Sequence, residues 1–299
     1  MDSVDEIKAR IDILDIVSEN VQLRRSGTSY VGFCPFHSNT RTPAFRVFPN
    51  TATWYCFGEC GEGGDVFSFL MKKEGWDFSE TLKYLAERAG VDLRPPTPEQ
   101  VQQKEESDRL RDLLEDVVNY YHNLLMNSDP GKVGKNYLFN RGLTEESIRE
   151  FKLGYSADSW DAVQTYFFKK GYTNEELEKV GLVYARDRGG YNDRFRHRVM
   201  IPIRDGRGRM AGFGGRALKP DEPAKYINTP QTEIFDKSTI LFGFDRSKRE
   251  IRKKEEVVIV EGYLDVITLH QAGYNNVVAQ MGTALTQQHM RQIKSLTTR

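Results

Sequence analysis

Two short cysteine-containing segments constrain this chain more than any other feature: Cys34-Pro-Phe-His37 and Cys56-Phe-Gly-Glu-Cys60. Together they contain all three cysteines of the 299 residues and one of the five histidines. Paired ligands with two or three residues between them match the spacing of a tetrahedral Zn²⁺ site built from thiolates and imidazole. The sequence therefore predicts one zinc ion held by Cys34, His37, Cys56 and Cys60. The alternative is three buried cysteines beside an unrelated histidine, and the absence of cysteines elsewhere argues against it.

We expect this zinc to be structural. Four protein ligands fill the coordination shell and leave no position for a reactive water. Between the ligand pairs, residues 44–48 and 51–55 alternate as two strands, and Pro49-Asn50 is a turn signal. A module of this size buries a small core, so bound zinc would supply part of its folding energy.

The overall composition excludes few classes of function. Lysine plus arginine equals aspartate plus glutamate at 43 each, so net charge does not indicate a partner. The first residues lack a basic start followed by an apolar run, and no apolar stretch reaches the roughly 18–20 residues of a membrane span. Free cysteines at metal-ligand spacing fit a reducing compartment. We therefore expect a cytoplasmic protein without membrane contact, and the length suggests about two domains.

Aromatic and arginine side chains are interleaved around the predicted hairpin. Aromatic faces for base stacking and guanidinium groups for phosphates are typical of a surface that binds single-stranded nucleic acid. A small sheet also needs aromatic residues for its core, and both interpretations remain open. The residues concerned are Tyr30, Phe33, Phe36, Phe45, Phe48, Trp54 and Tyr55, with Arg24, Arg25, Arg41 and Arg46.

Helical patterns flank the zinc segment. Ser3 with Glu6 forms a capping-box pattern before an apolar series that runs to Val17. Further helices are predicted after Asp65 and from Ser79 to a stop at Gly90. Residues 96–108 are rich in Pro, Gln, Glu and Lys, which is typical of a linker, and one long amphipathic helix is predicted across residues 110–125.

Residues 186–216 contain nine arginines and three aspartates, a local excess of six positive charges. Five glycines, at positions 206, 208, 212, 214 and 215, lie in or near two alternating segments that we expect to pair as antiparallel strands around an Asp-Gly turn. Glycines let backbone amides approach an anion, and arginines bind phosphate oxygens in a forked geometry. A groove for a polyanion is therefore predicted on this sheet, the alternative being a solvated surface.

The C-terminal part has the pattern of a βαβ unit. An apolar segment of strand length ends at Glu261-Gly262, residues 264–271 are helical, and residues 276–281 form a second buried strand. Glu261 would lie at the carboxyl edge of its strand, with Asp265 four residues further on. Two carboxylates at these positions could share a Mg²⁺ ion with substrate phosphates.

Seven motifs in this order resemble bacterial replicative DNA primase, and the resemblance covers essentially the whole chain. They are Cys34-Pro-Phe-His37, Trp54-Tyr-Cys-Phe-Gly58, Gly63-Gly-Asp-Val-Phe67, Arg194-Phe-Arg-His-Arg-Val-Met200, Gly212-Phe-Gly-Gly-Arg216, Lys225-Tyr-Ile-Asn228 and Val260-Glu-Gly-Tyr-Leu-Asp265. The resemblance implies an α+β protein in which an N-terminal zinc ribbon precedes a mixed α/β RNA polymerase core with a Toprim domain. It also implies synthesis of short RNA primers on single-stranded DNA from ribonucleoside triphosphates, with zinc and a catalytic Mg²⁺ or Mn²⁺.

The resemblance also implies site residues. Glu261 and Asp265 match the first acidic motif of the Toprim metal site. Basic positions of the active-site cleft correspond to Arg141, Arg216, Lys225 and Lys237. The strip that follows the template corresponds to Arg194, Arg196 and Asn228. The expected domains are a zinc ribbon at 1–95, a linker at 96–108, the N-terminal part of the core at 109–254 and the start of the Toprim domain at 255–299.

Two departures from the family pattern are visible. Three residues rather than two separate Cys56 from Cys60, which should alter the turn and keep the metal. The family's Toprim domain continues beyond the position of Arg299 into a strand with an Asp-x-Asp pair, and a helicase-binding domain follows. We therefore expect a fragment that binds single-stranded DNA as a monomer and makes no primer, with the segment 255–299 poorly ordered or misassociated. Two alternatives remain: a non-catalytic DNA-binding module, and a Toprim nuclease or topoisomerase.

Overall fold

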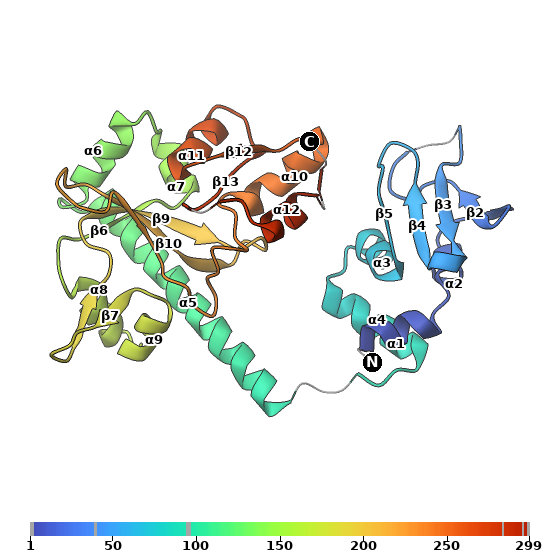
Figure 1. Cartoon of the computed structure of the whole chain (residues 1–299), viewed down its shortest axis with the longest axis horizontal. Helices are drawn as coiled ribbons and strands as arrows, with labels where there is room; N and C mark the ends of the chain where they lie inside the picture. The colour runs from blue at the N-terminus through green and yellow to red at the C-terminus, as the bar shows by residue number, and fades with distance from the viewer. Residues whose placement is uncertain (1–2, 39–40, 94–96, 283, 295, 298–299) are drawn as a thin grey trace. The chain divides into compact units, whose positions relative to one another are not determined.

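The structure is a computed structural model that describes residues 3–38, 41–93, 97–282, 284–294 and 296–297. It forms two compact units, residues 1–97 and residues 98–299, which are described one at a time (Figure 1). Within the described residues, no helix is both long enough and apolar enough to cross a membrane.

The first unit contains a five-stranded antiparallel sheet in the sequential order β1-β2-β3-β4-β5. The strands are β1 (Arg24–Ser26), β2 (Ser29–Gly32), β3 (Phe45–Phe48), β4 (Thr53–Cys56) and β5 (Gly63–Gly64). Strands β3 and β4 pair as the expected hairpin, with a short 3₁₀ turn at Pro49–Thr51 between them. Phe45 and Trp54 are buried and stack with ring centroids 5.3 Å apart.

Four helices complete the first unit: α1 (Ser3–Arg10), α2 (Ile13–Ser18), α3 (Val66–Glu74) and α4 (Phe78–Ala89). The predicted single N-terminal helix is two helices, because the Asp12 side chain accepts a hydrogen bond from Leu14 N and starts α2 anew. Asp65 caps α3 as expected. Helix α4 begins one residue earlier than predicted, and Asp77 forms a capping box with Glu80.

Helix α5 (Pro98–Asn127) opens the second unit and corrects the expected linker at 96–108. Residues 98–108 are helical, while residue 96 lies outside the described residues. Their Glu, Gln and Lys side chains are strong helix formers, and proline is tolerated in the first turn of a helix. These residues therefore extend the predicted amphipathic helix by three turns in the N-terminal direction.

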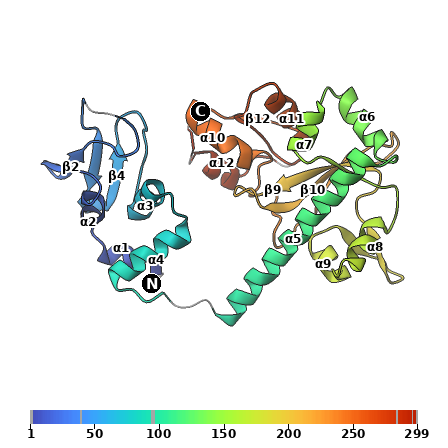
Figure 2. The same ribbon diagram turned by 180° about the vertical axis from the view of Figure 1, so that it is seen from behind.

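A four-stranded antiparallel sheet in the order β11-β10-β9-β6 forms the centre of this unit. Its strands are β6 (Gly154–Ser156), β9 (Arg198–Arg204), β10 (Met210–Ala217) and β11 (Tyr226–Asn228). Strands β9 and β10 are the expected pair around an Asp-Gly turn. Both sheet faces are covered: Ile201 and Ile203 join one hydrophobic cluster, while Met200 and Phe213 join another with α5. Figure 2 shows α5 crossing this sheet.

The remaining elements cover the sheet and its ends. They are α6 (Lys132–Asn140), α7 (Glu145–Glu150), α8 (Ala162–Lys169), α9 (Asn174–Lys179), β7 (Val183–Ala185), β8 (Tyr191–Asp193), α10 (Phe244–Lys254), β12 (Val258–Val260), α11 (Tyr263–Gln271), β13 (Val277–Ala279) and α12 (Gln287–Lys294). Strands β12 and β13 are parallel, which confirms the βαβ unit and the α+β class.

The C-terminal segment is packed rather than poorly ordered, contrary to expectation. Val266, Ile267 and Val277 are fully buried in the cluster that contains Ile201 of the central sheet. Helix α10 and strand β13 share a further small core around Ile251 and Val278. A βαβ unit with two strands can therefore remain ordered here, because the central sheet and α10 cover its apolar faces.

Candidate zinc centre and nucleic-acid-binding site

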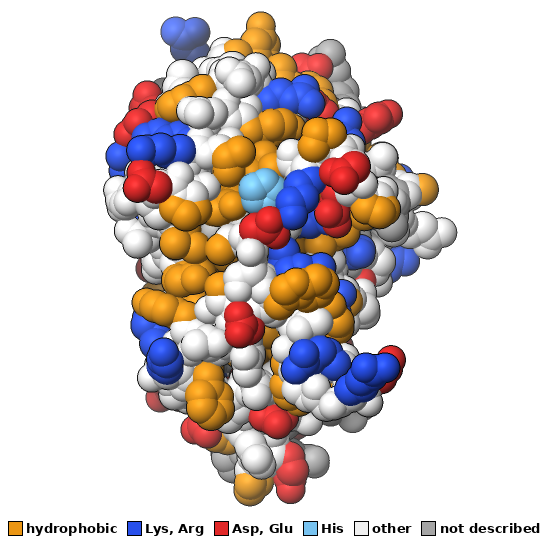
Figure 3. All heavy atoms as spheres, turned by 90° about the vertical axis from the view of Figure 1, so that its left-hand side faces the viewer, with side chains coloured by type: hydrophobic (Ala, Val, Ile, Leu, Met, Phe, Trp, Pro, Cys, Tyr) orange, Lys and Arg blue, Asp and Glu red, His pale blue; other side chains and the backbone are white. Residues whose placement is uncertain are grey.

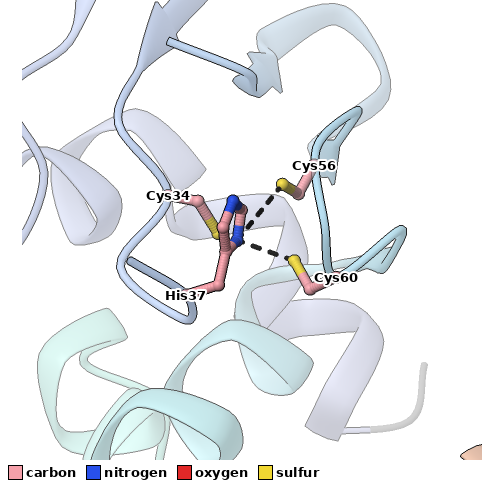
Figure 4. Close-up of side chains that lie close together, drawn as sticks. All are labelled: Cys34, His37, Cys56 and Cys60. Carbon is pink, nitrogen blue, oxygen red and sulfur yellow. Dashed lines mark hydrogen bonds between the residues drawn. The ribbon is translucent and has the colours of Figure 1, made fainter. Parts of the chain in front are cut away.

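The first unit brings the two cysteine-containing segments together. Cys34 and His37 follow β2, Cys56 ends β4, and Cys60 lies in the turn before β5. Their four ligand atoms all lie within 4.8 Å of one another, and the side chains converge (Figure 4). Cys34 Sγ lies 3.6 Å from Cys60 Sγ, and His37 Nδ1 lies 3.9 Å from Cys56 Sγ.

These distances fit a tetrahedral ion. Zinc–sulfur bonds of about 2.3 Å place two sulfur ligands roughly 3.8 Å apart, close to the separation of Cys34 and Cys60. Burial raises the pKa of the Cys34 thiol to about 12, so without metal this thiol is neutral, and a bound cation would have to displace its proton. The donor set and the geometry both suit one Zn²⁺.

The three-residue spacing of the second pair is accommodated by its turn. Gly58 N donates to Cys56 Sγ at 3.3 Å, and Gly61 N donates to Gly58 O. A side chain on Gly58 would lie 3.0 Å from His37 Nε2, so this position needs glycine for a close approach to the imidazole. Cys60 thereby reaches the cluster although Glu59 is inserted and exposed.

The aromatic residues of the zinc unit divide between core and surface. Phe45 and Trp54 are buried, whereas Phe33 and Tyr55 are exposed. Phe57, which the sequence analysis did not single out, is 64% exposed, and its ring centroid lies 4.7 Å from that of Tyr55. The sequence signal that could have predicted its exposure is its position in the turn between Cys56 and Cys60. The core interpretation therefore holds for Phe45 and Trp54, and binding of nucleic acid by the exposed rings stays a prediction.

In the second unit, Arg194, Arg196 and Asn228 line one hollow of about 690 Å³. Sequence reasoning missed Trp160, His197 and the other lining residues. The guanidinium carbon of Arg196 lies 3.6 Å from the centroid of the exposed Trp160 ring. Burial lowers the pKa of Arg194, whose Nε is buried without a hydrogen-bond partner among the described residues. The hollow therefore combines a stacking surface with desolvated cationic groups.

Three of the nine arginines of residues 186–216 form ion pairs with carboxylates, so less free positive charge is available for the predicted groove than the sequence suggested. Arg198 is buried against Glu222, Arg204 pairs with Glu115, and Arg209 pairs with Asp205. These three guanidinium groups are neutralised by carboxylates. Figure 3 views the side of the molecule with α6, α8 and β7, where basic, acidic and hydrophobic side chains are mixed.

The glycines of β10 have a packing role, and the predicted contact of their backbone with an anion stays a prediction. Side chains at Gly212, Gly214 and Gly215 would collide with Thr229, Tyr263 and Phe195 respectively. All three glycines are buried. Their backbone therefore closely approaches neighbouring side chains.

Three of the four proposed cleft residues lie around β10, β11 and α6. Arg216 and Lys225 line one pocket of about 430 Å³. Arg216 Nε donates to Tyr137 Oη at 3.1 Å, and Arg141 lies over the same Tyr137 ring. Interaction with Tyr137 raises the pKa of Arg141, and Asp265 adds a smaller effect. Lys237 lies apart, in the loop between β11 and α10, where its backbone faces His289 of α12.

Glu261 follows β12, and Asp265 lies in the first turn of α11, where its carboxylate accepts a hydrogen bond from Gly262 N at 3.1 Å. Both carboxylates are exposed. Between them, Tyr263 is buried and its hydroxyl donates to Asn228 Oδ1 at 2.7 Å. One hydrogen bond thus joins the acidic end of β12 to a residue that lines the hollow.

Three family models match the chain: the CHC2 zinc finger at residues 1–101, the N-terminal domain of the DNA primase catalytic core at 120–248, and the Toprim domain at 255–298. A crystal structure of the Aquifex aeolicus primase zinc-binding and RNA polymerase domains is 34% identical, with a TM-score of 0.60, covering 99% of this chain and 70% of that one. The chain belongs to the bacterial DNA primase family.

Further relatives support this family assignment. A DNA primase of Halalkalibacterium halodurans is 40% identical over 294 residues, which are 98% of this chain and 49% of that protein. A primase catalytic domain solved bound to single-stranded DNA is 36% identical with a TM-score of 0.59, covering 65% of this chain and 60% of that one. The chain thus spans about half the length of the curated primases that it matches.

Proposed function

We propose that this primase chain takes part in the synthesis of short RNA primers on single-stranded DNA from ribonucleoside triphosphates. The observation that carries the proposal is the hydrogen bond from Tyr263 to Asn228. This hydrogen bond links the carboxyl end of β12, where Glu261 lies, to Asn228 in the hollow that Arg194 and Arg196 also line. A template strand bound in the hollow would therefore pass beside the carboxylates of Glu261 and Asp265. Membership of the primase family supports the same activity.

Each group of residues has a proposed role. Arg194, Arg196 and Asn228 hold the template strand, with Trp160 as a stacking surface. The substrate triphosphate is held by Arg141, Arg216 and Lys225, which lie around Tyr137 and the neighbouring pocket. Lys237, which lies apart from them, is assigned to the same role on the resemblance alone. Cys34, His37, Cys56 and Cys60 hold a structural zinc. In the zinc unit, the exposed rings of Phe33, Tyr55 and Phe57 contact unpaired bases.

Glu261 and Asp265 are the proposed ligands of a catalytic Mg²⁺ or Mn²⁺. Such an ion, when bound, assists attack by a 3′-hydroxyl and stabilises the leaving pyrophosphate. No third acidic, histidine or cysteine side chain joins these two in a ligand cluster within the part of the chain that the structure describes. A divalent ion held by two carboxylates depends on substrate phosphates and water for its other ligands. We therefore propose that a polypeptide of these 299 residues binds template and makes no primer by itself.

A replicative helicase is the further partner that we propose, contacted by a part of the enzyme outside residues 1–299. This proposal rests on the resemblance of the chain to its family. It is independent of the template and metal sites.

The binding step is tested with a fluorescent single-stranded DNA and the 299-residue polypeptide. Replacing Arg194 and Arg196 by Ala should lower affinity at least tenfold and reduce the salt dependence by about one to two released counterions. The matched control replaces Arg188 and Arg207, two exposed arginines outside the hollow, and removes the same net charge. Equal losses in both double variants would contradict the assignment of the hollow.

A further inference from the structure

A buried carboxylate lies directly behind the Arg196–Trp160 pair. Asp193 ends β8 and is 1% exposed. Its two oxygens accept hydrogen bonds from the first turn of α8, from Val163 N at 2.8 Å and from Gln164 N at 3.0 Å. The residue at the N-cap position of α8, Asp161, makes no side-chain capping bond. The cap of this helix therefore comes from a residue 30 positions further along the chain.

The backbone of the same residue holds both members of the pair. Asp193 N donates to Trp160 O at 2.7 Å, and Arg196 Nη1 donates to Asp193 O at 2.7 Å. The Arg196 guanidinium then lies 3.6 Å from the Trp160 ring centroid. The Asp193 carboxylate thus fixes the start of α8, two residues beyond Trp160, while the Asp193 backbone is bonded to Trp160 and Arg196.

We propose that Asp193 is a positioning residue for template binding, which holds Trp160 and Arg196 in the stacked arrangement that lines the hollow. This inference rests on the proposed function, because Arg196 and Trp160 matter only if the hollow receives single-stranded DNA. Asp193 does not line the hollow and acts through the other two residues.

The ionised carboxylate is the form that accepts both amide bonds. Burial raises the pKa of Asp193 to about 6, a net value in which the two amides and Arg196 act in the lowering direction and Asp161 in the raising direction. Tyr120 and Tyr121 of α5 also face this carboxylate, and burial raises the pKa of both, so they stay neutral near pH 6. Protonation of Asp193 removes an acceptor position and weakens its hold on α8. Template affinity should therefore fall as the pH decreases through about 6.

The test compares Asp193→Asn with Asp161→Asn, which removes a neighbouring charge that makes no bond to the α8 amides. Affinity for a fluorescent single-stranded DNA is measured from pH 5 to pH 8. At pH 7.5, Asp193→Asn should weaken binding by about tenfold, as expected when an ionic acceptor is lost from a buried amide pair. The wild type and Asp161→Asn should both lose affinity below pH 6, whereas Asp193→Asn should show a flatter profile.

A second measurement separates positioning from a general loss of folding. In a background that lacks both positioned side chains, Trp160→Ala with Arg196→Ala, Asp193→Asn should weaken binding by less than about twofold further, because the residues it positions are gone. Full additivity in this triple variant, or a wild-type pH profile in Asp193→Asn, would overturn the inference. If the Arg194 and Arg196 double variant binds normally, the proposed function fails instead. If the Arg194 and Arg196 double variant binds single-stranded DNA more weakly while Asp193→Asn binds it as tightly as the wild type, only the positioning role of Asp193 is contradicted.

Discussion

The Tyr263 ring occupies the space in which a side chain on Gly214 would lie. A Cβ placed on Gly214 would be 2.7 Å from Tyr263 Cε2, closer than any normal contact. The glycine of β10 therefore lets α11 approach the central sheet, and this approach brings the Tyr263 hydroxyl to Asn228. The glycine-rich strand β10 therefore contributes to the candidate site by allowing close packing of α11, which positions Tyr263 next to Asn228.

Gly214→Ala should consequently destabilise the second unit by about 1–3 kcal/mol, the usual cost of overpacking a buried contact. Urea unfolding followed by circular dichroism measures this free energy. Gly206→Ala is the matched control, since its added Cβ would be 3.4 Å from Phe244, an ordinary contact. Equal stability of the two variants would show that Tyr263 can move aside.

Tyr263→Phe should weaken single-stranded DNA binding by roughly three- to tenfold, because Asn228 loses the hydrogen bond that orients its amide. The control is Tyr226→Phe, a neighbouring tyrosine whose ring would still pack on Arg216. Fluorescence anisotropy at fixed salt gives both affinities. Equal affinities of the two variants for single-stranded DNA would show that the orientation of Asn228 does not affect template binding.

Removing a zinc ligand should unfold the first unit selectively. Cys56→Ser should abolish zinc binding and increase amide hydrogen exchange across residues 3–93, since a closed zinc site contributes several kcal/mol to a small module. Residues 98–294 should keep their protection, because they form a separate compact unit. Glu59→Ala changes the exposed inserted residue and should retain one zinc per chain by elemental analysis. Wild-type protein purified without chelator and free of zinc would contradict the site.

The ion pair between Lys8 and Asp65 gives a pH-dependent contribution to the first unit. Burial opposes ionisation of Asp65, but Lys8 and the Ser68 amide outweigh it and lower the pKa below its usual 3.8. The stabilisation is therefore present above about pH 4 and is lost as the pH falls through the lowered value. Because both side chains are partly exposed, at 42% and 33%, Lys8→Met should cost less than about 1 kcal/mol at pH 7. Thermal unfolding should show a larger difference between wild type and Lys8→Met at pH 7 than at pH 3, since the stabilisation decreases as the pH falls below the usual pKa of Asp65.

Much of the local structure could be predicted because its signals are local. Ligand spacing indicated the zinc cluster, alternation indicated β3 and β4, and the strand-length apolar segments indicated β12 and β13. Asp12 was missed because a capping bond inside an apolar series interrupts a helix without changing its periodicity. The expected linker failed for the opposite reason, because residues 98–108 are polar and also good helix formers.

The site itself could be predicted only in part. The resemblance indicated Arg194, Arg196 and Asn228, yet nothing in the sequence indicates that Trp160 would stack on Arg196, since 36 residues separate them. Counting arginines overestimated the free positive charge of residues 186–216, because Glu115 and Glu222 come from distant segments to pair with Arg204 and Arg198. Charge pairing of this kind depends on tertiary contacts and leaves no local pattern.

The most direct measurement is template-dependent RNA synthesis by a chimaera in which these 299 residues replace the matched 294-residue segment of the Halalkalibacterium halodurans primase. With single-stranded template, four ribonucleotides and Mg²⁺ or Mn²⁺, the chimaera should make short RNA. Glu261→Gln should abolish the product while leaving zinc content and template binding unchanged. RNA synthesis that survives Glu261→Gln, or no RNA from a zinc-loaded chimaera that binds template, would contradict the account.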